Sequence, residues 1–400
     1  MKQIFPGSIT GKGAGALHAG SVRDHKFGQS DPYTLGVEEE YMLLDSETFD
    51  LVQHIDTVLQ AISGHELEPQ INAELMQSVL EIATPVCRNA GDVQRELLKL
   101  RGYVTQVGRD KGLRVGSAGT HPFSLFERQR ITARDRYRNL VDQLQYIARR
   151  ELIFGMHVHV AVDDPEKAIQ VVNGLLPQLG PLLALSASSP FWRGEPTGLS
   201  SSRQMVFAAF PRSGPPPRFR DYEDYAELVG QLERTGCIAD YTHIWWDIRL
   251  HPRLGTVEIR ICDAVTRVED ATALAAYCQA LVKFLSEQFD RGEQIPSFHR
   301  ILTTENKWLA ARYGLEAPVM DLATGRRNRV PVAQIIRRTL KEIEPHAREL
   351  GSERELGGIG EILSRGNGSD RQLRVFNANR DIVEVVEEIS KATEALPEPA

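Results

Sequence analysis

Strand-like and helix-like stretches alternate along the chain from residue 34 onward. Alternating side-chain character predicts strands in TLGVEEEYMLL (34–44), LRVGSAG (113–119), ELIFGMHVHVAV (151–162) and HIWWDIRLHPRLGTVEIRI (243–261), the last being two strands joined by a turn. Helical apolar periodicity predicts helices at about 89–110, 126–150, 165–187, 221–236 and 269–290. After Pro331 the pattern predicts only helices, interrupted by a Gly-rich polar loop from Gly366 to Asp370.

The same pattern divides the chain into three parts. Residues 1–33 are rich in Gly, Ser, His and Lys and predict a flexible N-terminal tail. Within it, GSITGKGAG (7–15) is a poor phosphate-binding loop, because Gly follows the Lys and no strand precedes it. Residues 34–376 are predicted to form one large domain, and residues 377–400 a C-terminal helix and tail.

Composition and charge narrow the class of protein. A 42% apolar and 25% charged composition is typical of globular chains, and the formal charge of −7 disfavours nucleic acid as a partner. The four cysteines show no spacing of a zinc site. We find neither a targeting leader nor an apolar run of the roughly 18 residues that a membrane helix needs. We therefore expect a cytoplasmic protein without a membrane partner.

Glu38 and Glu40 share one face of a strand that is apolar on both faces. Two carboxylates side by side on a strand repel each other unless water or a cation lies between them. A solvated edge strand would explain a generic run of glutamates. Here Met42 and Leu44 continue the glutamate face while Val37 and Tyr41 make the other face apolar, which indicates a central strand and a bound cation.

Three further segments place polar side chains where apolar ones are expected. NAELMQSVLEIATP (72–85) carries Glu74 and Glu81, and MHVHV (156–160) presents two histidines on one face. The hairpin WDIRLHPRLGTVEIRICD (246–263) lines one face with Arg249, Glu258 and Arg260. Each segment alone also fits a solvated face or a satisfied core residue. Together they favour the concave face of a sheet that lines a pocket holding Mg²⁺, or Mn²⁺, and ATP.

At this point the sequence resembles a known family. GVEEEYMLLD, NAELMQSVLEIATP, AGTHPF, GMHVHV, LSASSPFWRGEPTGLSSSR, WWDIRLHPRLGTVEIRICDA and ENKWLAARYGLEA together resemble the type 2 glutamate–cysteine ligases, the YbdK-like carboxylate–amine ligases. The resemblance spans about residues 35–370. It implies an α+β fold like the catalytic domain of glutamine synthetase, with a curved, largely antiparallel sheet and helices on its outer face. It also implies an ATP-dependent ligase that activates a carboxylate as an acyl phosphate and joins it to an amine.

The resemblance also implies roles for individual residues. The implied metal ligands are Glu38, Glu40, Glu74, Glu81, His157 and Glu258. Arg260 and Arg249 are implied to face the phosphates. The implied substrate contacts are Arg203, Asn306 and Arg312. Thr120 and His121 lie in the THPF turn, where packing and a pocket role are equally open.

Two other classes of function remain open. A di-metal hydrolase could use the same carboxylates and histidines to activate water without nucleotide. A non-catalytic relative is disfavoured, because buried charges are costly when they serve no partner. The implied partners are ATP, an amino-acid carboxylate and an amine. The sequence does not identify the amine, no motif selects cysteine, and a homo-oligomer stays open.

Overall fold

The computed structural model describes residues 21–325 and 328–394. Seven strands form the central sheet in the order β10-β11-β5-β1-β3-β2, with β4 pairing the end of β1. The strands are β1 (Leu35–Asp45), β2 (Ile71–Ala73), β3 (Val79–Ala83), β4 (Leu113–Gly116), β5 (Met156–Ala161), β10 (Ile248–His251) and β11 (Thr256–Ile259), and every pair is antiparallel. This confirms the predicted α+β class with a largely antiparallel sheet.

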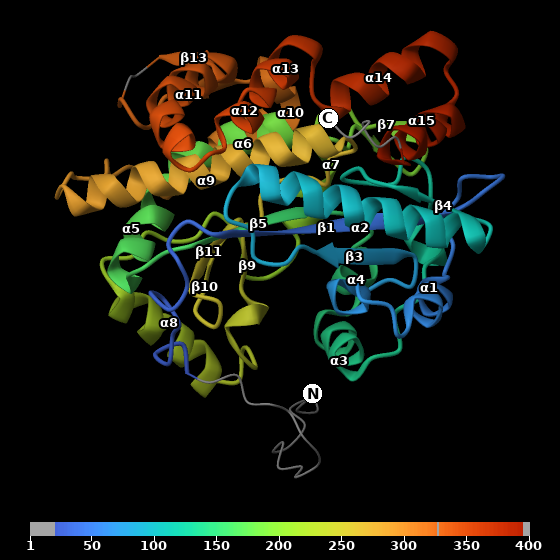
Figure 1. Ribbon diagram of the computed structural model, residues 1–400, viewed down its shortest axis with the longest axis horizontal. Coiled ribbons are helices and arrows are strands. Elements are labelled where there is room, and N and C mark those ends of the chain that lie inside the picture. Colours follow the sequence, from blue (N-terminus) through green and yellow to red (C-terminus); the bar gives the residue numbers. More distant parts are fainter. Residues whose placement is uncertain (1–20, 326–327, 395–400) are drawn as a thin grey trace, which may run out of the picture.

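One group of helices covers one face of the sheet, and a second group lies on the other side. Helices α2 (Ala90–Asp110) and α9 (Val268–Asp290) lie against the sheet, and α10 (Arg300–Tyr313), α11 (Val332–Glu349), α12 (Glu353–Leu356) and α13 (Gly358–Arg365) stack beyond α9 (Figure 1). On the opposite side lie α3 (Asp135–Leu144), α4 (Tyr146–Arg149) and α8 (Tyr222–Arg234) (Figure 1). The remaining helices are α1 (Ile55–Ile62), α5 (Pro165–Leu175), α6 (Leu179–Ser186), α7 (Ser202–Phe207), α14 (Gly368–Asn379) and α15 (Ile382–Glu394).

Three two-stranded ladders complete the regular structure. They pair β6 (Phe191–Trp192) with β7 (Glu195–Pro196), β8 (Ser213–Gly214) with β9 (Trp245–Trp246), and β12 (Pro318–Met320) with β13 (Arg329–Pro331). The β8–β9 ladder is parallel and leads directly into β10.

Strand β1 is central, and its two faces carry different chemistry. Val37, Glu39 and Tyr41 are buried on the helix-covered face. There Arg101 of α2 donates two hydrogen bonds to Glu39, from Nη2 to Oε1 at 2.5 Å and from Nε to Oε2 at 3.0 Å. Because successive side chains of a strand alternate, Glu38 and Glu40 point to the opposite face, as the sequence predicted.

Several predicted elements differ from the observed ones. The helix predicted at 126–150 is broken, because Gln145 adopts a positive φ of 51° between α3 and α4. The loop predicted from Gly366 to Asp370 is shorter, because Asn367 caps α14 with reciprocal hydrogen bonds to Asp370. Helix α14 also runs through residue 376, so the chain has no structural break at that predicted boundary.

The predicted N-terminal tail is partly ordered against the domain. Val22 and Phe27 are buried, and the backbone nitrogen of Lys26 donates to the Pro252 carbonyl at 2.8 Å. The prediction of a flexible segment is therefore wrong for residues 21–33, while residues 1–20 lie outside the described chain. One described segment, Pro165–Ser186, is long and apolar enough to cross a membrane, but 94% of its most apolar 18-residue stretch is buried inside the fold, as in the core helix of a folded domain.

Candidate active site

A cavity of about 300 Å³ opens on the sheet face that lies away from α2 and α9. Nine of the eleven predicted site residues line it: Glu38, Glu40, Glu74, Glu81, His157, Arg203, Arg249, Glu258 and Arg260. They come from strands β1, β3, β5, β10 and β11 and from the segments around them. The sheet thus brings together residues that are spread over more than half of the sequence.

Strand register explains how these side chains meet. Glu38 lies directly across from His157 of β5, and Glu40 lies across from Glu81 of β3. Glu258 of β11 lies across from His159. Directly paired residues of neighbouring strands point to the same face with their side chains in contact range. Three cross-strand pairs therefore line one continuous surface.

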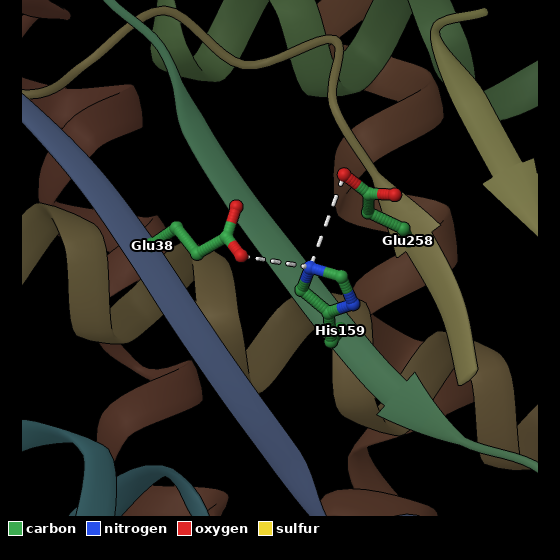
Figure 2. Close-up of side chains that lie close together, drawn as sticks. All are labelled: Glu38, His159 and Glu258. Atoms are coloured by element: carbon green, nitrogen blue, oxygen red, sulfur yellow. Dashed lines mark ion pairs between the residues drawn. The ribbon is translucent and has the colours of Figure 1, made fainter. Parts of the chain in front are cut away.

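The side chains of Glu38, His159 and Glu258 form a candidate cation site. One ligand atom from each lies within 4.8 Å of the others. Figure 2 shows the His159 Nε2 atom between the two carboxylates, at 3.5 Å from Glu38 and 3.8 Å from Glu258. This nitrogen is buried without a hydrogen-bond partner in the described chain, while Nδ1 contacts Thr256 Oγ1 at 3.1 Å and orients the ring. Two carboxylates and an orphaned imidazole nitrogen fit a divalent cation such as Mg²⁺ or Mn²⁺.

His159 was not among the predicted ligands, whereas its neighbour on the same face, His157, was. His157 Nδ1 contacts Glu38 Oε2 at 3.0 Å, and burial lowers the pKa of this histidine to about 4. A neutral His157 can orient the Glu38 carboxylate. The signal for His159 was present in the sequence, because the two histidines of an H-x-H strand segment share a face.

Glu40, Glu74 and Glu81 form a second group of carboxylates. Burial and the nearby charge of Glu74 raise the pKa of Glu40 to about 7, and burial also raises the pKa values of Glu74 and Glu81. Glu38 behaves differently. Burial opposes its charge, but the hydrogen bond with His157 and the nearby ring of His159 hold its pKa well below the usual range. Too little positive charge surrounds Glu40, Glu74 and Glu81 to offset their negative charges. A bound cation would relieve the repulsion among these carboxylates.

The two hairpin arginines have different surroundings. Arg249 is fully engaged: its Nε and Nη2 donate to Glu258 at 2.7 and 3.0 Å, and its Nη1 donates to the Thr242 carbonyl at 3.0 Å. Arg260 contacts Glu258 through Nη1, but its buried Nε has no partner in the described chain. Arg249 therefore positions Glu258, whereas Arg260 retains a donor for a ligand.

Arg203 enters the cavity from α7. Its Nη1 and Nη2 donate weakly to the Ile261 and Arg260 carbonyls at 3.3 and 3.4 Å, and its buried Nε has no partner in the described chain. The guanidinium passes close to Gly155, where an added Cβ would lie 2.4 Å from Arg203 Nη2. A glycine at position 155 is therefore required for Arg203 to reach this position.

Two predicted substrate contacts do not line the cavity. Asn306 is buried and exchanges hydrogen bonds with the Met320 backbone at 2.7 and 2.8 Å, which pins α10 to β12. Arg312 donates to the Gly198 carbonyl and stacks over Tyr313. Both side chains make packing contacts outside the cavity, and their roles as substrate contacts stay predictions. Both residues lie on α10, and no local sequence pattern indicates that this helix lies away from the cavity.

The THPF turn also serves packing. Thr120 Oγ1 donates to the Phe191 carbonyl at 2.8 Å. The ring of His121 contacts the Phe49 carbonyl through Nε2 at 2.9 Å and accepts the Ser124 backbone N–H through Nδ1 at 2.9 Å. Burial lowers the pKa of His121 to about 4, consistent with a neutral ring. Neither residue lines the cavity.

The fold and the cavity define an α+β protein with a Glu/His/Arg site on the free face of an antiparallel sheet. The model of the glutamate–cysteine ligase family 2 matches residues 34–391, so the chain belongs to that family. A Rubrobacter xylanophilus protein whose name marks it as a candidate glutamate–cysteine ligase 2-1 is 43% identical over 91% of this chain and 95% of its own length. A Sorangium cellulosum protein, by name a candidate glutamate–cysteine ligase 2, is 42% identical over 89% of this chain and 95% of its own.

Solved structures show the same fold at low sequence identity. A Francisella tularensis glutamate–cysteine ligase in complex with AMP matches with a TM-score of 0.64 and 14% identity, over 93% of this chain and 91% of that chain. A bifunctional glutathione synthetase from Pasteurella multocida matches with a TM-score of 0.67 and 16% identity, over 90% of this chain and 52% of that longer chain. These matches confirm the predicted fold.

Proposed function

We propose that this protein is an ATP-dependent carboxylate–amine ligase. A carboxylate oxygen of the acid attacks the γ-phosphorus of ATP, and the bond to ADP breaks with its electron pair on ADP. The amine nitrogen, in its uncharged form, then attacks the carbonyl carbon of the acyl phosphate, the C–O bond to phosphate breaks with its electron pair on phosphate, and the nitrogen loses one proton to give the amide. The products are an amide, ADP and phosphate.

One observation carries the proposal: two clusters of carboxylates line one cavity together with Arg203 and Arg260. The buried Nε atoms of these two arginines have no partner in the described chain. Glu38, His159 and Glu258 would hold one divalent cation, and Glu40, Glu74 and Glu81 are suited to another. Bound Mg²⁺ supplies charge neutralisation along the phosphates. Arg260 is placed to stabilise the transferred phosphoryl group, and Arg203 the carboxylate of the acid.

The relatives' names suggest L-glutamate as the acid and L-cysteine as the amine, with γ-glutamylcysteine as the product. We propose L-glutamate and L-cysteine as the first pair to test, with a weak glutamate–cysteine ligase activity, since no motif in the sequence selects cysteine. The test is a screen of amino acids and amines for ADP release with MgATP. The ligase proposal expects ADP only when acid and amine are both present. Turnover without nucleotide would instead support the di-metal hydrolase.

Arg260→Lys is expected to lower kcat about a hundredfold. The lysine keeps the positive charge but loses the planar fork that can bind Glu258 and a phosphoryl oxygen together. Steady-state kinetics with the pair selected by the screen measures the effect, and Arg253→Lys, on the turn between β10 and β11, is the matched control. Kinetics of Arg260→Lys equal to wild type would refute the phosphoryl role of Arg260.

Gly155→Ala is expected to raise the KM for the acid about tenfold or more, with a smaller change in kcat. The new methyl group would displace the Arg203 guanidinium, and a hydrogen bond to a charged group is worth about 1.5–3 kcal/mol. Gly360→Ala is the control, because an added Cβ there meets no atom within 4 Å. An unchanged KM for the acid would contradict the assignment of Arg203.

A further inference from the structure

Glu151 is a carboxylate of the cavity that the proposed reaction has not yet used. It lies on the connection between α4 and β5, outside the sheet that supplies the other acids. Its backbone is well anchored, since its own N–H donates to the Ala148 carbonyl at 3.2 Å and the next residue, Leu152, is buried in a separate core cluster. Glu151 and Ile153 both line the cavity, on either side of the buried Leu152.

The carboxylate of Glu151 has no cationic partner of its own. Glu38 and Glu258 accept hydrogen bonds from His157 and from the two hairpin arginines, and Glu40 accepts one from the Gly155 backbone. Glu151 forms no side-chain hydrogen bond or ion pair with any residue in 21–325 or 328–394. Burial and the charges of Glu40 and Glu74 raise its pKa well above the usual range. A positively charged ligand group would relieve this unfavourable environment.

The position of Glu151 favours an organic cation over a metal ion. The side chain beside it, Ile153, packs with Phe207 and Phe210, and all three line the same cavity. A carboxylate next to an apolar wall suits an ammonium group carried on a hydrocarbon skeleton.

Glu151 lines the same cavity as the two arginines assigned to the acid and its phosphoryl group. The charges of Arg203 and Arg260, which line the same cavity, act on Glu151, and each of these arginines has a buried Nε without a partner in the described chain. In the proposed reaction these arginines hold the acid and its transferred phosphoryl group. An amine bound by Glu151 would therefore face the carbonyl carbon that it must attack.

We propose that Glu151 binds the ammonium group of the amine substrate, a primary amine whose hydrocarbon part lies on Ile153 and Phe207. This inference rests on the proposed ligase function and adds the residue that selects the nucleophile. Glu151 holds the charged amine beside the acyl phosphate until the nitrogen loses a proton and attacks.

A pair of nucleophiles of nearly equal size tests the proposal. Methylamine is cationic at neutral pH, whereas hydroxylamine is mostly uncharged and converts an acyl phosphate to a hydroxamate. The full-length chain is assayed with MgATP, the acid chosen by the screen, and either nucleophile, alongside n-butylamine and L-cysteine. The variants are Glu151→Gln, Glu151→Asp and the control Glu195→Gln, an exposed carboxylate on β7.

We expect Glu151→Gln to lower kcat/KM for the primary amines at least about tenfold, the loss typical of one charge-assisted hydrogen bond. Hydroxamate formation should stay within about threefold of wild type, Glu151→Asp should recover part of the amine activity, and Glu195→Gln should match wild type. A parallel loss of both reactions, or of neither, would overturn the role of Glu151. Wild-type hydroxamate formation without coupling of any primary amine would also overturn it. No hydroxamate with any acid would instead contradict the acyl-phosphate ligase itself.

Discussion

Glu38→Gln is expected to abolish amide formation, with kcat reduced at least about a thousandfold and the fold left intact. The amide oxygen of the glutamine can still contact His157, so the β1–β5 contact survives. The variant loses the negative charge that, with His159 and Glu258, would hold a divalent cation. Losing a single preorganised electrostatic contact in an active site commonly lowers the rate by roughly 10²–10³. The loss of a bound cation would lower it further, because the cation acts in every later step.

Coupled ADP release and thermal unfolding together measure this outcome. The structure makes Glu38 a sharper test than Glu258, because Glu258 also compensates the buried charges of Arg249 and Arg260. A Glu258 variant would lose stability as well as activity. ATP-dependent ligation by Glu38→Gln at the wild-type rate would rule out Glu38 as a metal ligand.

Glu39→Gln is expected to give the opposite result, a loss of about 3–5 kcal/mol in the free energy of unfolding with kcat nearly unchanged below the melting transition. Arg101 and Glu39 are each about 1% exposed. Burial disfavours the charged form of Arg101, but the charge of Glu39 raises its pKa above the usual range. Removing the negative partner would leave the guanidinium charge buried beside neutral groups.

Denaturant unfolding measures the stability, and activity is assayed at low temperature where the variant is folded. Glu38 and Glu39 are adjacent residues of one strand, so each variant is the matched control of the other. A catalytic defect in folded Glu39→Gln, or a free energy of unfolding equal to wild type, would contradict the separation of the two faces of β1.

Local periodicity predicted the central-sheet strands β1, β4, β5, β10 and β11, and the face on which most site residues lie. Alternation along β1 placed Glu38 and Glu40 together, and the apolar character of both faces indicated a central strand. The partner of Glu39 could not be predicted, because Arg101 lies 62 residues away on a helix whose contact with β1 is set by the tertiary fold. Without a known partner, a charged residue in a helix is predicted to face solvent.

The positions that local sequence patterns missed or misplaced depend on contacts between segments that are far apart in the chain. Glu151 fell within the strand predicted at 151–162, on the same face as His157 and His159, but it was not assigned a role; the structure places it on the connection before β5. Asn306 was attributed to the site from a resemblance of the segment ENKWLAARYG, whereas its side chain fastens α10 to β12. The ordering of residues 21–33 depends on buried Val22 and Phe27 contacting the domain, which a Gly-rich composition conceals.

Transfer of oxygen from the acid to phosphate tests the central claim most directly. The acid selected by the screen is labelled with ¹⁸O in its carboxylate and incubated with MgATP, the amine and the wild-type protein, and the released phosphate is analysed by mass spectrometry. An acyl-phosphate ligase places one carboxylate oxygen in phosphate for every amide formed, because the C–O bond breaks when the amine attacks. Unlabelled phosphate at the same amide yield would contradict the proposed mechanism.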